Sequence, residues 1–457
     1  GPGLTNAITA MAQARADSIP MLVISGVSNA EHRGEELGQL HELPDQAGMM
    51  RTIALSSETL DKASDIEVVL DRAFRAMTVA RPGPVHIEIP LNLMAELIDV
   101  PNLAVKTLSP TIKPTDLALE EAAQRCRDAQ QVVIIAGGGA IDADIRPLAE
   151  RLDAPVVTTI NARGIIANHP LSVPASPSEK PVRDLLAAAD LVIAVGTQFG
   201  PTDFDMYVDG KFPVLQHLIR IDIDAAQTTK GQTADQVIVA DAKETIQGLT
   251  RLLGDDKAQS NGAERANRAR QDTFDNLPEL YRASVGILKT ISDTLPGCVM
   301  VGDSTQLIYA GNSYCEINQP RGWFNSATGY GALGYGAPAA IGAKIANSDV
   351  PVVCLTGDGG FQFCLAELGT AMDENTPVIF IVWNNNGYQE IETYMVDNQI
   401  SPIGVKPSAP DFVMLAKSYG MQGECITNTK DIHADLVTAL TRGHESMKPY
   451  LIEIQTS

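Results

Sequence analysis

The sequence GDGG at residues 357–360 decides the fold of this chain. It follows Val352–Leu355, one of several short β-branched runs that alternate with longer helical segments, as the strands of parallel sheets do. Asp358 is therefore expected at the carboxyl end of a parallel strand, where open α/β sheets bind ligands. The next such run, Val378–Val382, brings Asn385 to the neighbouring strand end. Together the two stretches predict a ligand site at one edge of a sheet.

The residues around Asp358 have the composition of a cation and phosphate site. Gly359 and Gly360 let the backbone come close to a bound group. The following segment, Phe361–Asp373, has apolar residues at helical spacing, which predicts a helix whose N-terminal N–H groups point at the same place. A carboxylate, the Asn385 amide oxygen and a nearby carbonyl are oxygen ligands, which suit a hard cation such as Mg²⁺ or Ca²⁺. The alternative is an ordinary acidic turn.

The overall charge limits the classes of partner. A net charge of -22 argues against nucleic acid or an anionic membrane, because the summed field repels both. A phosphate-bearing cofactor would need a cation or a helix N-terminus beside it. No apolar run approaches the roughly 20 residues that span a bilayer, and the six cysteines show no CxxC spacing. We therefore expect a cytoplasmic protein with reduced thiols.

The chain is too long for one hydrophobic core and shows three α/β stretches. We predict three doubly wound parallel-sheet domains at 1–95, 113–255 and 272–457, joined by a Pro-punctuated linker through Pro114 and a charged linker at Asp255–Gln271. The helix at the start reads as already under way and lacks an initiator Met, so we expect that part of the first domain is missing. The predicted strands are Met21–Ser25, Val85–Ile89, Val132–Ala136, Val156–Thr159, Leu191–Val195, Leu218–Ile223, Cys298–Val301, Val352–Leu355, Val378–Val382 and Tyr450–Ile454.

The spacing of the acidic and amide residues resembles a known signature. Asn385 follows Asp358 by 27 positions, and GDG followed at this interval by NN is similar to the motif of thiamine-diphosphate-dependent enzymes. The resemblance implies that Asp358, Asn385 and the carbonyl of Gly387 ligate Mg²⁺ and that thiamine diphosphate is the cofactor. The other cofactor-facing residues that it implies are Gly357, Gly359, Gly360, Ser304 and Thr305.

A glycine-rich segment, residues 328–336, supports the same resemblance. It precedes a run of small residues, Pro338–Ala346, that is typical of a closely packed helix. In this family a bulky apolar residue in such a segment wedges under the cofactor and bends it, and Leu333 occupies that position. The carbonyl of Gly331 would accept a hydrogen bond from the 4′-amino group of the cofactor. An ordinary core leucine is the alternative interpretation of Leu333.

The first residues, Gly1–Asn6, resemble the GPGxxN loop of the family's pyrimidine-binding domain. That loop normally faces the cofactor of a partner subunit, so the resemblance implies a homodimer or homotetramer with an inter-subunit active site. The glutamate that activates the cofactor normally lies upstream of this loop. It is therefore expected outside this chain.

The family reaction is attack of the cofactor's C2 carbanion on a 2-oxo acid, followed by loss of CO₂ through an enamine. His41 and Glu42 are the candidate catalytic residues, because an imidazole can shuttle the proton that completes the reaction. Acetolactate synthases usually have Phe-Gln where His41-Glu42 stands, and a Trp-bearing segment where this chain has Tyr394. A surface role for His41 is the alternative.

Three segments together resemble the 5-guanidino-2-oxopentanoate decarboxylases, namely LHELPDQ at 40–46, GDSTQ at 302–306 and GYQEIETYM at 387–395. Glu390 or Glu392, with Tyr394 beside them, could face the substrate, because carboxylates pair with a guanidinium. A solvated helix face is the alternative for these glutamates. For the whole protein, the alternatives are an acetolactate-synthase-type carboligase and a non-catalytic relative.

The central stretch has a triple glycine, Gly137–Gly139, after a predicted strand, and Ile221–Asp224 at a later strand end. Some relatives hold FAD in this domain and others hold nothing. A triple glycine without a fuller GxGxxG pattern is weak evidence for a dinucleotide. FAD is thus an alternative second cofactor that the sequence disfavours.

Overall fold

The computed structural model describes residues 1–99, 111–204, 212–255, 258–427 and 430–456. These form two compact units, residues 1–113 and 114–457. Every pairing within the three sheets is parallel, which confirms the predicted α/β class with three parallel sheets. The predicted domain boundaries stay predictions, and most of the first linker lies outside the described residues. No helix in the described ranges is long and apolar enough to cross a membrane.

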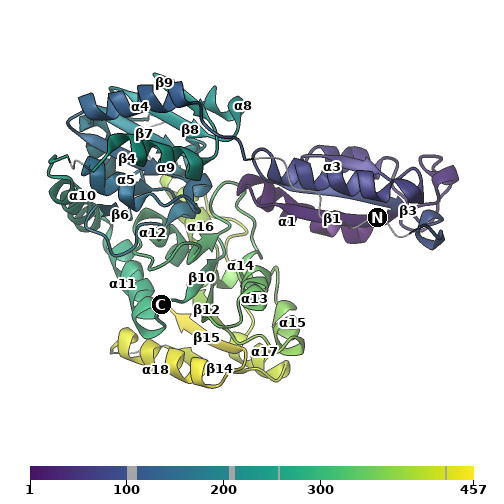
Figure 1. Cartoon of the computed structure of the whole chain (residues 1–457). Helices are drawn as coiled ribbons and strands as arrows, with labels where there is room; N and C mark the ends of the chain where they lie inside the picture. The colour runs from purple at the N-terminus through teal and green to yellow at the C-terminus, as the bar shows by residue number, and fades with distance from the viewer. Residues whose placement is uncertain (100–110, 205–211, 256–257, 428–429, 457) are drawn as a thin grey trace. The chain divides into compact units, whose positions relative to one another are not determined.

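The first unit is a three-stranded sheet of order β1-β3-β2 with helices packed on it (Figure 1). Its strands are β1 (Met21–Val27), β2 (Ser57–Thr59) and β3 (Pro84–Pro90), and its helices are α1 (Pro2–Ala16), α2 (Gln46–Arg51) and α3 (Ile66–Thr78), with 3-10 turns at Ala30–His32, Ala63–Asp65 and Leu93–Ala95. The α3 helix buries Val69, Ala73 and Met77, which lie four residues apart and so share one face. These side chains pack on Val85 and Ile87 of β3.

The second unit begins with a six-stranded sheet of order β6-β5-β4-β7-β8-β9, the 3-2-1-4-5-6 order of a Rossmann fold. Its strands are β4 (Val132–Ala136), β5 (Val156–Thr158), β6 (Ser172–Val173), β7 (Leu191–Val195), β8 (Leu218–Asp222) and β9 (Gln236–Val239). Its helices are α4 (Asp116–Asp128), α5 (Arg146–Leu152), α6 (Lys180–Ala188), α7 (Pro201–Phe204), α8 (Ala225–Thr228), α9 (Ala242–Leu253) and α10 (Gly262–Asn276), with 3-10 turns at Gly138–Ala140 and Ile160–Ala162.

The same unit ends with a six-stranded sheet of order β11-β10-β12-β13-β15-β14 (Figure 1). Its strands are β10 (Val299–Gly302), β11 (Trp323–Asn325), β12 (Val352–Gly357), β13 (Val378–Asn384), β14 (Gln422–Ile426) and β15 (Tyr450–Gln455), and its helices are α11 (Glu279–Thr294), α12 (Gln306–Ser313), α13 (Gly336–Ala346), α14 (Asp358–Phe361), α15 (Glu367–Asp373), α16 (Gln389–Asp397), α17 (Phe412–Ser418) and α18 (Ile432–Glu445). Alternate residues of β12 feed two cores: Val353 and Leu355 pack with α11, α12 and α18, whereas Val352 and Cys354 pack with α13, α15 and α17. Both faces are covered, as in a doubly wound sheet.

Two local predictions were wrong. The charged segment Asp255–Gln271, predicted as a linker, contains most of α10, whose small residues Ala266 and Ala269 pack into the core of the central sheet. A stripe of small residues buries little apolar area, so its pattern was hidden by the surrounding charges. Within the helix predicted at Phe361–Asp373 only its last part, α15 (Glu367–Asp373), is helical beyond Phe361, where α14 ends; a turn separates α14 from α15. As a result, α14, the helix that begins at Asp358, is only four residues long.

A buried arginine connects the two sheets of the second unit. Arg163 is fully buried beside the central sheet and donates to the carbonyl oxygens of Pro174, Asn312 and Cys315. Burial lowers the pKa of the guanidinium to about 10, although nearby groups that include Asp203 and Glu179 act in the opposite direction. Since Asn312 lies on α12, this cation ties the central layer to the layer that carries the predicted site.

Candidate active site

The predicted site residues lie where the order of the last sheet reverses. Counting along the chain, its strands run 2-1-3-4-6-5, so the switch point falls between β10 and β12. β10 ends at Gly302 and is followed by Asp303, and β12 ends at Gly357 and is followed by Asp358. Crossovers leave in opposite directions at such a point, which opens a crevice at the carboxyl ends of the strands. The sequence therefore places Asp303 and Asp358 at a sheet edge suited to a ligand.

A cavity of about 700 Å³ opens at this switch point. Its wall includes most of the predicted cofactor, metal and substrate residues: Ser304, Thr305, Gly331, Leu333, Gly357, Asp358, Gly359, Gly360, Asn385, Gly387 and Glu390. Thr202 of α7 also contributes, so the central layer forms part of the same wall. This volume is in the range that holds small-molecule ligands and cofactors.

Asp358 is the most deeply placed polar group of the cavity, with 1% of its surface exposed. Burial raises the pKa of its carboxyl group, while backbone N–H groups, first that of Asn385, act in the opposite direction. Its Oδ1 accepts from the N–H of Asn385 at 3.4 Å, whereas its buried Oδ2 has no hydrogen-bond partner among the described residues. A buried carboxylate oxygen without a donor is costly. A bound cation would remove that cost.

The side-chain amide of Asn385 lies beside the carboxylate of Asp358. One of its terminal atoms lies 3.2 Å from Asp358 Oδ1 and 3.0 Å from the carbonyl oxygen of Gly387. If that atom is nitrogen, it donates to both; if it is oxygen, three oxygens converge and require a cation between them. This donor set of carboxylate, amide and carbonyl fits a hard divalent cation. The described residues hold no cluster of three or more His, Cys, Asp or Glu side chains suited to a metal.

The loop that carries Gly387 is fixed from the neighbouring strand. Gly387 has a φ of 141°, and a side chain there would meet the Val405 carbonyl oxygen at 2.4 Å, so only glycine fits. Asn384 anchors the start of the loop, because its amide donates to the buried carboxylate of Glu453 on β15 at 2.7 Å. Its Oδ1 accepts from the N–H of Asn386. The first Asn of the pair thus positions the loop, and the second faces Asp358.

The glycine-rich segment forms the facing wall. Leu333 is half-buried, lines the cavity and lies against Gly360, where an added Cβ would meet its Cδ2 at 3.4 Å. Gly331 is exposed with a φ of 76°. Leu333 therefore does not have the surroundings of a core leucine, and Gly331 is not packed within a turn, since both residues line the cavity. The roles inferred for them from the family stay predictions.

Several aromatic residues of the cavity escaped the sequence analysis. Tyr388 packs so closely on Gly359 that a Cβ there would lie 2.5 Å from its ring. Tyr281 of α11 and Tyr309 of α12 also line the wall. Tyr388 directly follows the NNNG stretch, and that adjacency was a usable signal. Tyr281 and Tyr309 come from helices before the motif, and nothing in their local sequence predicts that they reach it.

The three predicted substrate residues on α16 differ in their surroundings. Glu390 lines the cavity, and desolvation by the surrounding wall raises the pKa of its carboxyl group although the residue as a whole is exposed. Glu392 forms an ion pair with Lys406 at 2.8 Å and does not line the cavity. Tyr394 is exposed, outside the cavity wall. The structure thus separates Glu390 from the other two.

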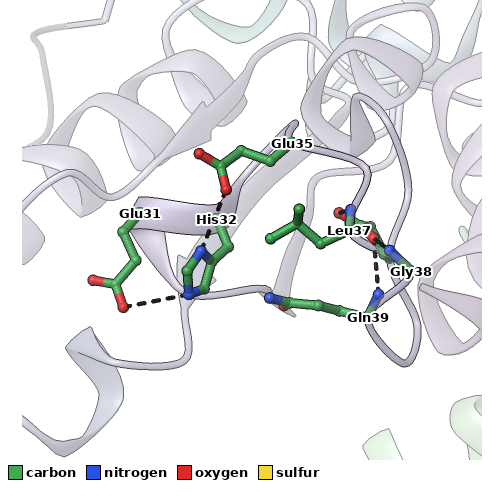
Figure 2. Close-up of polar contacts among 7 residues, drawn as sticks. Glu31, His32, Glu35, Leu37, Gly38 and Gln39 are labelled. Carbon is green, nitrogen blue, oxygen red and sulfur yellow. Dashed lines mark hydrogen bonds and ion pairs between the residues drawn. The ribbon is translucent and has the colours of Figure 1, made fainter.

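His41 and Glu42 lie in the first unit, on a loop before α2. His41 is exposed with a φ of 68°, and its backbone lies beside Gly1, so it adjoins the GPGxxN loop. The carboxylate of Glu42 accepts from the N–H groups of three residues, Leu37, Gly38 and Gln39, at 3.3, 2.8 and 2.9 Å. Figure 2 shows these donors on one turn, with His32 nearby between Glu31 and Glu35. Glu42 therefore holds the loop, which counts against it as a proton donor.

The triple glycine of the central sheet lies at that sheet's own switch point, between β4 and β7. Here the backbone closes the crevice: a Cβ on Gly137 would meet the Gly196 carbonyl oxygen at 2.2 Å, and one on Gly139 would meet the Gly196 Cα at 2.9 Å. The N–H of Gly139 donates to the same carbonyl at 3.1 Å. These glycines serve close packing between two strand ends.

The open switch point defines a class, the α/β enzymes that hold a phosphate-bearing cofactor at strand ends. Comparison of the sequence with known families extends this. Residues 303–454 match the description "Thiamine pyrophosphate enzyme, C-terminal TPP binding domain", residues 119–249 match its central domain, and residues 1–49 match its N-terminal TPP binding domain. The chain belongs to the thiamine pyrophosphate enzymes, and thiamine diphosphate is accordingly its cofactor.

Individual relatives fall into two groups. The chain is 37% identical over 427 residues to the probable 2-ketoarginine decarboxylase of Pseudomonas aeruginosa, covering 92% of this chain and 76% of that protein. It is 30% identical to the acetolactate synthase isozyme 3 large subunit of Escherichia coli, covering 96% and 80%. It is 29% identical to the probable acetolactate synthase large subunit of Methanococcus aeolicus, covering 99% and 80%. Decarboxylases and carboligases are thus both represented.

Proposed function

We propose that this protein decarboxylates a 2-oxo acid that carries a guanidinium group, with 5-guanidino-2-oxopentanoate as the candidate substrate. The observation that carries the proposal is the carboxylate of Glu390. It lines the cavity that contains Asp358, and among the described residues no hydrogen bond or ion pair engages it. Desolvation raises the pKa of Glu390 although the residue is exposed, and a neighbouring cationic group would favour its charged form. A guanidinium would supply that cation and several N–H donors.

Glu392 and Tyr394, which were equal candidates in the sequence, receive less support. Glu392 is already neutralised by Lys406, and neither side chain lines the cavity. We propose that Glu392 instead holds the Lys406 segment against α16. The 37% identity to a probable 2-ketoarginine decarboxylase supports the same substrate class.

For the cofactor we propose that Asp358, Asn385 and the carbonyl of Gly387 hold Mg²⁺. The unpartnered Asp358 Oδ2 and the converging Asn385 amide support this assignment. The chain carries a net charge of -22, so a cation beside a diphosphate would also offset repulsion. When bound, thiamine diphosphate supplies the electron sink for loss of CO₂. The wall formed by Leu333 and Tyr388 would orient it and limit water.

His41 is the group in the first unit that we propose moves a proton onto the product. It is exposed beside Gly1, at the start of the loop that resembles the partner-facing GPGxxN segment. This arrangement supports a cytoplasmic homodimer or homotetramer in which the first unit of one subunit completes the site of another.

The test is a product assay of the holoenzyme with thiamine diphosphate and Mg²⁺. We expect CO₂ and the guanidino aldehyde from 5-guanidino-2-oxopentanoate, and no acetolactate from pyruvate alone. EDTA should abolish turnover. Formation of acetolactate from pyruvate as the main product would replace the proposal by a carboligase, and no turnover of any 2-oxo acid would leave a non-catalytic relative.

A pair of variants tests the carboxylate itself. Glu390→Gln should raise KM for the guanidino substrate by about 10- to 100-fold, because a charged hydrogen bond contributes roughly 1.5–3 kcal/mol. Its effect on a neutral 2-oxo acid should be small. Glu392→Gln is the matched control on the same helix and should leave KM for both substrates near wild type. Equal effects of the two variants would show that Glu390 has no special contact with the substrate.

A further inference from the structure

A second buried carboxylate lies at the switch point, across from Asp358. Asp303 follows β10 and is 0% exposed. Its backbone N–H donates to the Leu355 carbonyl of β12 at 2.8 Å, so it is fixed between the two strands that diverge there. Burial raises the pKa of its carboxyl group, and four hydrogen-bond donors act in the opposite direction. The resemblance to the family assigns no role to this residue.

The donors to Asp303 come from the segments that line the cavity. The N–H of Ser304 donates to its Oδ1 and the N–H of Gly334 donates to its Oδ2, each at 2.8 Å. The N–H of Gly336 and the hydroxyl of Ser326 also lower the pKa of the carboxyl group and so favour its charged form. Asp303 thus satisfies the backbone N–H that directly follows Leu333 and the backbone N–H of Ser304 at its own strand end.

The bond to Gly334 has a direct consequence for the cavity wall. Gly334 has a φ of 81°, and an added Cβ would lie 2.8 Å from the Cβ of Phe363, so the turn is tightly confined. Leu333 precedes it and lies against Gly360. The carboxylate of Asp303 itself comes within 3.5 Å of an added Cβ on Gly360. One carboxylate therefore joins the three segments that face the cofactor: residues 302–305, 331–336 and 357–360.

We propose that Asp303 is a positioning residue that holds Leu333 and Ser304 in place for thiamine diphosphate. It touches no substrate and acts through the backbone of its neighbours. The proposal rests on binding of the cofactor in this cavity and is independent of which 2-oxo acid is used. Its closing experiment therefore measures cofactor binding, so that it can succeed where the decarboxylase assignment fails.

The decisive variant is Asp303→Asn, which keeps the size of the side chain. An amide has one acceptor oxygen, so its NH₂ group must face either the Ser304 or the Gly334 N–H, and one buried donor loses its acceptor. The turn should shift. We expect the Kd for thiamine diphosphate, measured by calorimetry with Mg²⁺, to rise about 10- to 100-fold, as for other residues that orient the groups around a metal site. The near-ultraviolet circular dichroism of the bound cofactor, which reports its twist, should change as well.

The matched control is Asp190→Asn. Asp190 also accepts from two backbone N–H groups, those of Gln130 and Gln131 at 2.7 and 2.8 Å, but it lies on the central layer away from the cavity wall. The Asp190→Asn variant should have a lower melting temperature but an unchanged Kd for thiamine diphosphate and an unchanged circular dichroism spectrum. A folded Asp303→Asn protein with wild-type Kd and spectrum would overturn the proposal. If Asp303→Asn does not fold, Gly334→Ala decides, because it displaces the same N–H and keeps the carboxylate: weaker binding with the spectral change supports the proposal, and wild-type binding overturns it.

Discussion

The second unit contains two doubly wound sheets, and each has glycines at its switch point. In the last sheet, GDGG at 357–360 faces a cavity of about 700 Å³ and the unpartnered Oδ2 of Asp358. In the central sheet, Gly137 and Gly139 press against the backbone of Gly196 at the strand ends. The same residue type at the same topological place thus opens one crevice and closes the other.

The difference lies in what faces the glycines. Gly357 faces the side chain of Thr305, which can be displaced or bonded to a ligand, whereas Gly137 faces a carbonyl of the chain itself. Close approach of two backbones is one use of glycine, and approach of a backbone to a phosphate is another. A glycine run alone therefore does not predict a nucleotide site. The four predictions below test this comparison.

The largest effect is expected from Asp358→Asn. Loss of the carboxylate removes the charged ligand of the proposed cation site, so affinity for thiamine diphosphate in the presence of Mg²⁺ should fall by about 100-fold or more, at or beyond the upper end of effects seen for residues around a metal. Calorimetry measures this. Asp224→Asn, which caps α8 at a strand end of the central sheet, should change nothing because Asn caps equally well. Unchanged affinity in Asp358→Asn would contradict the metal assignment.

The next effect should come from Leu333→Ala. Its side chain supports the cavity wall beside Gly360, so turnover should fall about 10- to 100-fold through loss of orientation. Thermal stability should change little, because Leu333 is only half-buried. Leu368→Ala is the contrasting variant: that leucine is fully buried under the sheet, so it should cost about 2–5 kcal/mol of stability and leave turnover per folded molecule intact. Similar kinetics for both variants would make Leu333 an ordinary packing residue.

A smaller effect, on stability alone, is expected from Gly137→Ala. The added methyl group would meet the Gly196 carbonyl at 2.2 Å, which should cost about 1–3 kcal/mol of unfolding free energy. Gly138→Ala is the control within the same run, because its Cβ would make only an ordinary contact with Asn161 at 3.6 Å. Thermal unfolding compares the two. If they are equally stable, the glycines of the central sheet are not used for packing.

The smallest effect is expected from added FAD. Since the central switch point is closed by backbone, FAD should not shift the melting temperature, and the purified protein should show no flavin absorbance. Saturable stabilisation by FAD would break the comparison, because it would require Gly196 to move away from Gly139. Thiamine diphosphate with Mg²⁺ is the positive control in the same assay.

The sequence predicted most of the buried strands because they are continuous apolar runs. Val132–Ala136 and Leu191–Val195 were predicted with the bounds that the structure shows. The missed strands, such as β14 at Gln422–Ile426, lie at edges or are very short, where a half-exposed strand has polar residues. The break between α14 and α15 was also missed, since apolar spacing continues across the turn.

Asp358 and Asn385, the residues proposed to hold a cation, could be brought together from the sequence because each follows a strand of the same sheet. Glu390 and Glu392 could not be separated, because they lie two residues apart on one helix and only the position of Lys406 distinguishes them. Asp303 was also passed over, although it lies within GDSTQ, since its donor Gly334 is distant in sequence. Such contacts depend on tertiary packing, which local patterns do not report.

Arg163 links the central layer to the layer that carries the cavity. Its guanidinium donates to three carbonyl oxygens, one of them that of Asn312 on α12, and α12 begins at Gln306 in the cavity wall. Through this contact the central layer braces the helix that carries part of the cavity wall. Substitutions around residue 163 should therefore lower catalytic activity, although these residues do not contact the substrate or the reacting atoms. A minimal enzyme built by deleting the central layer would lose its active-site geometry along with the deleted residues.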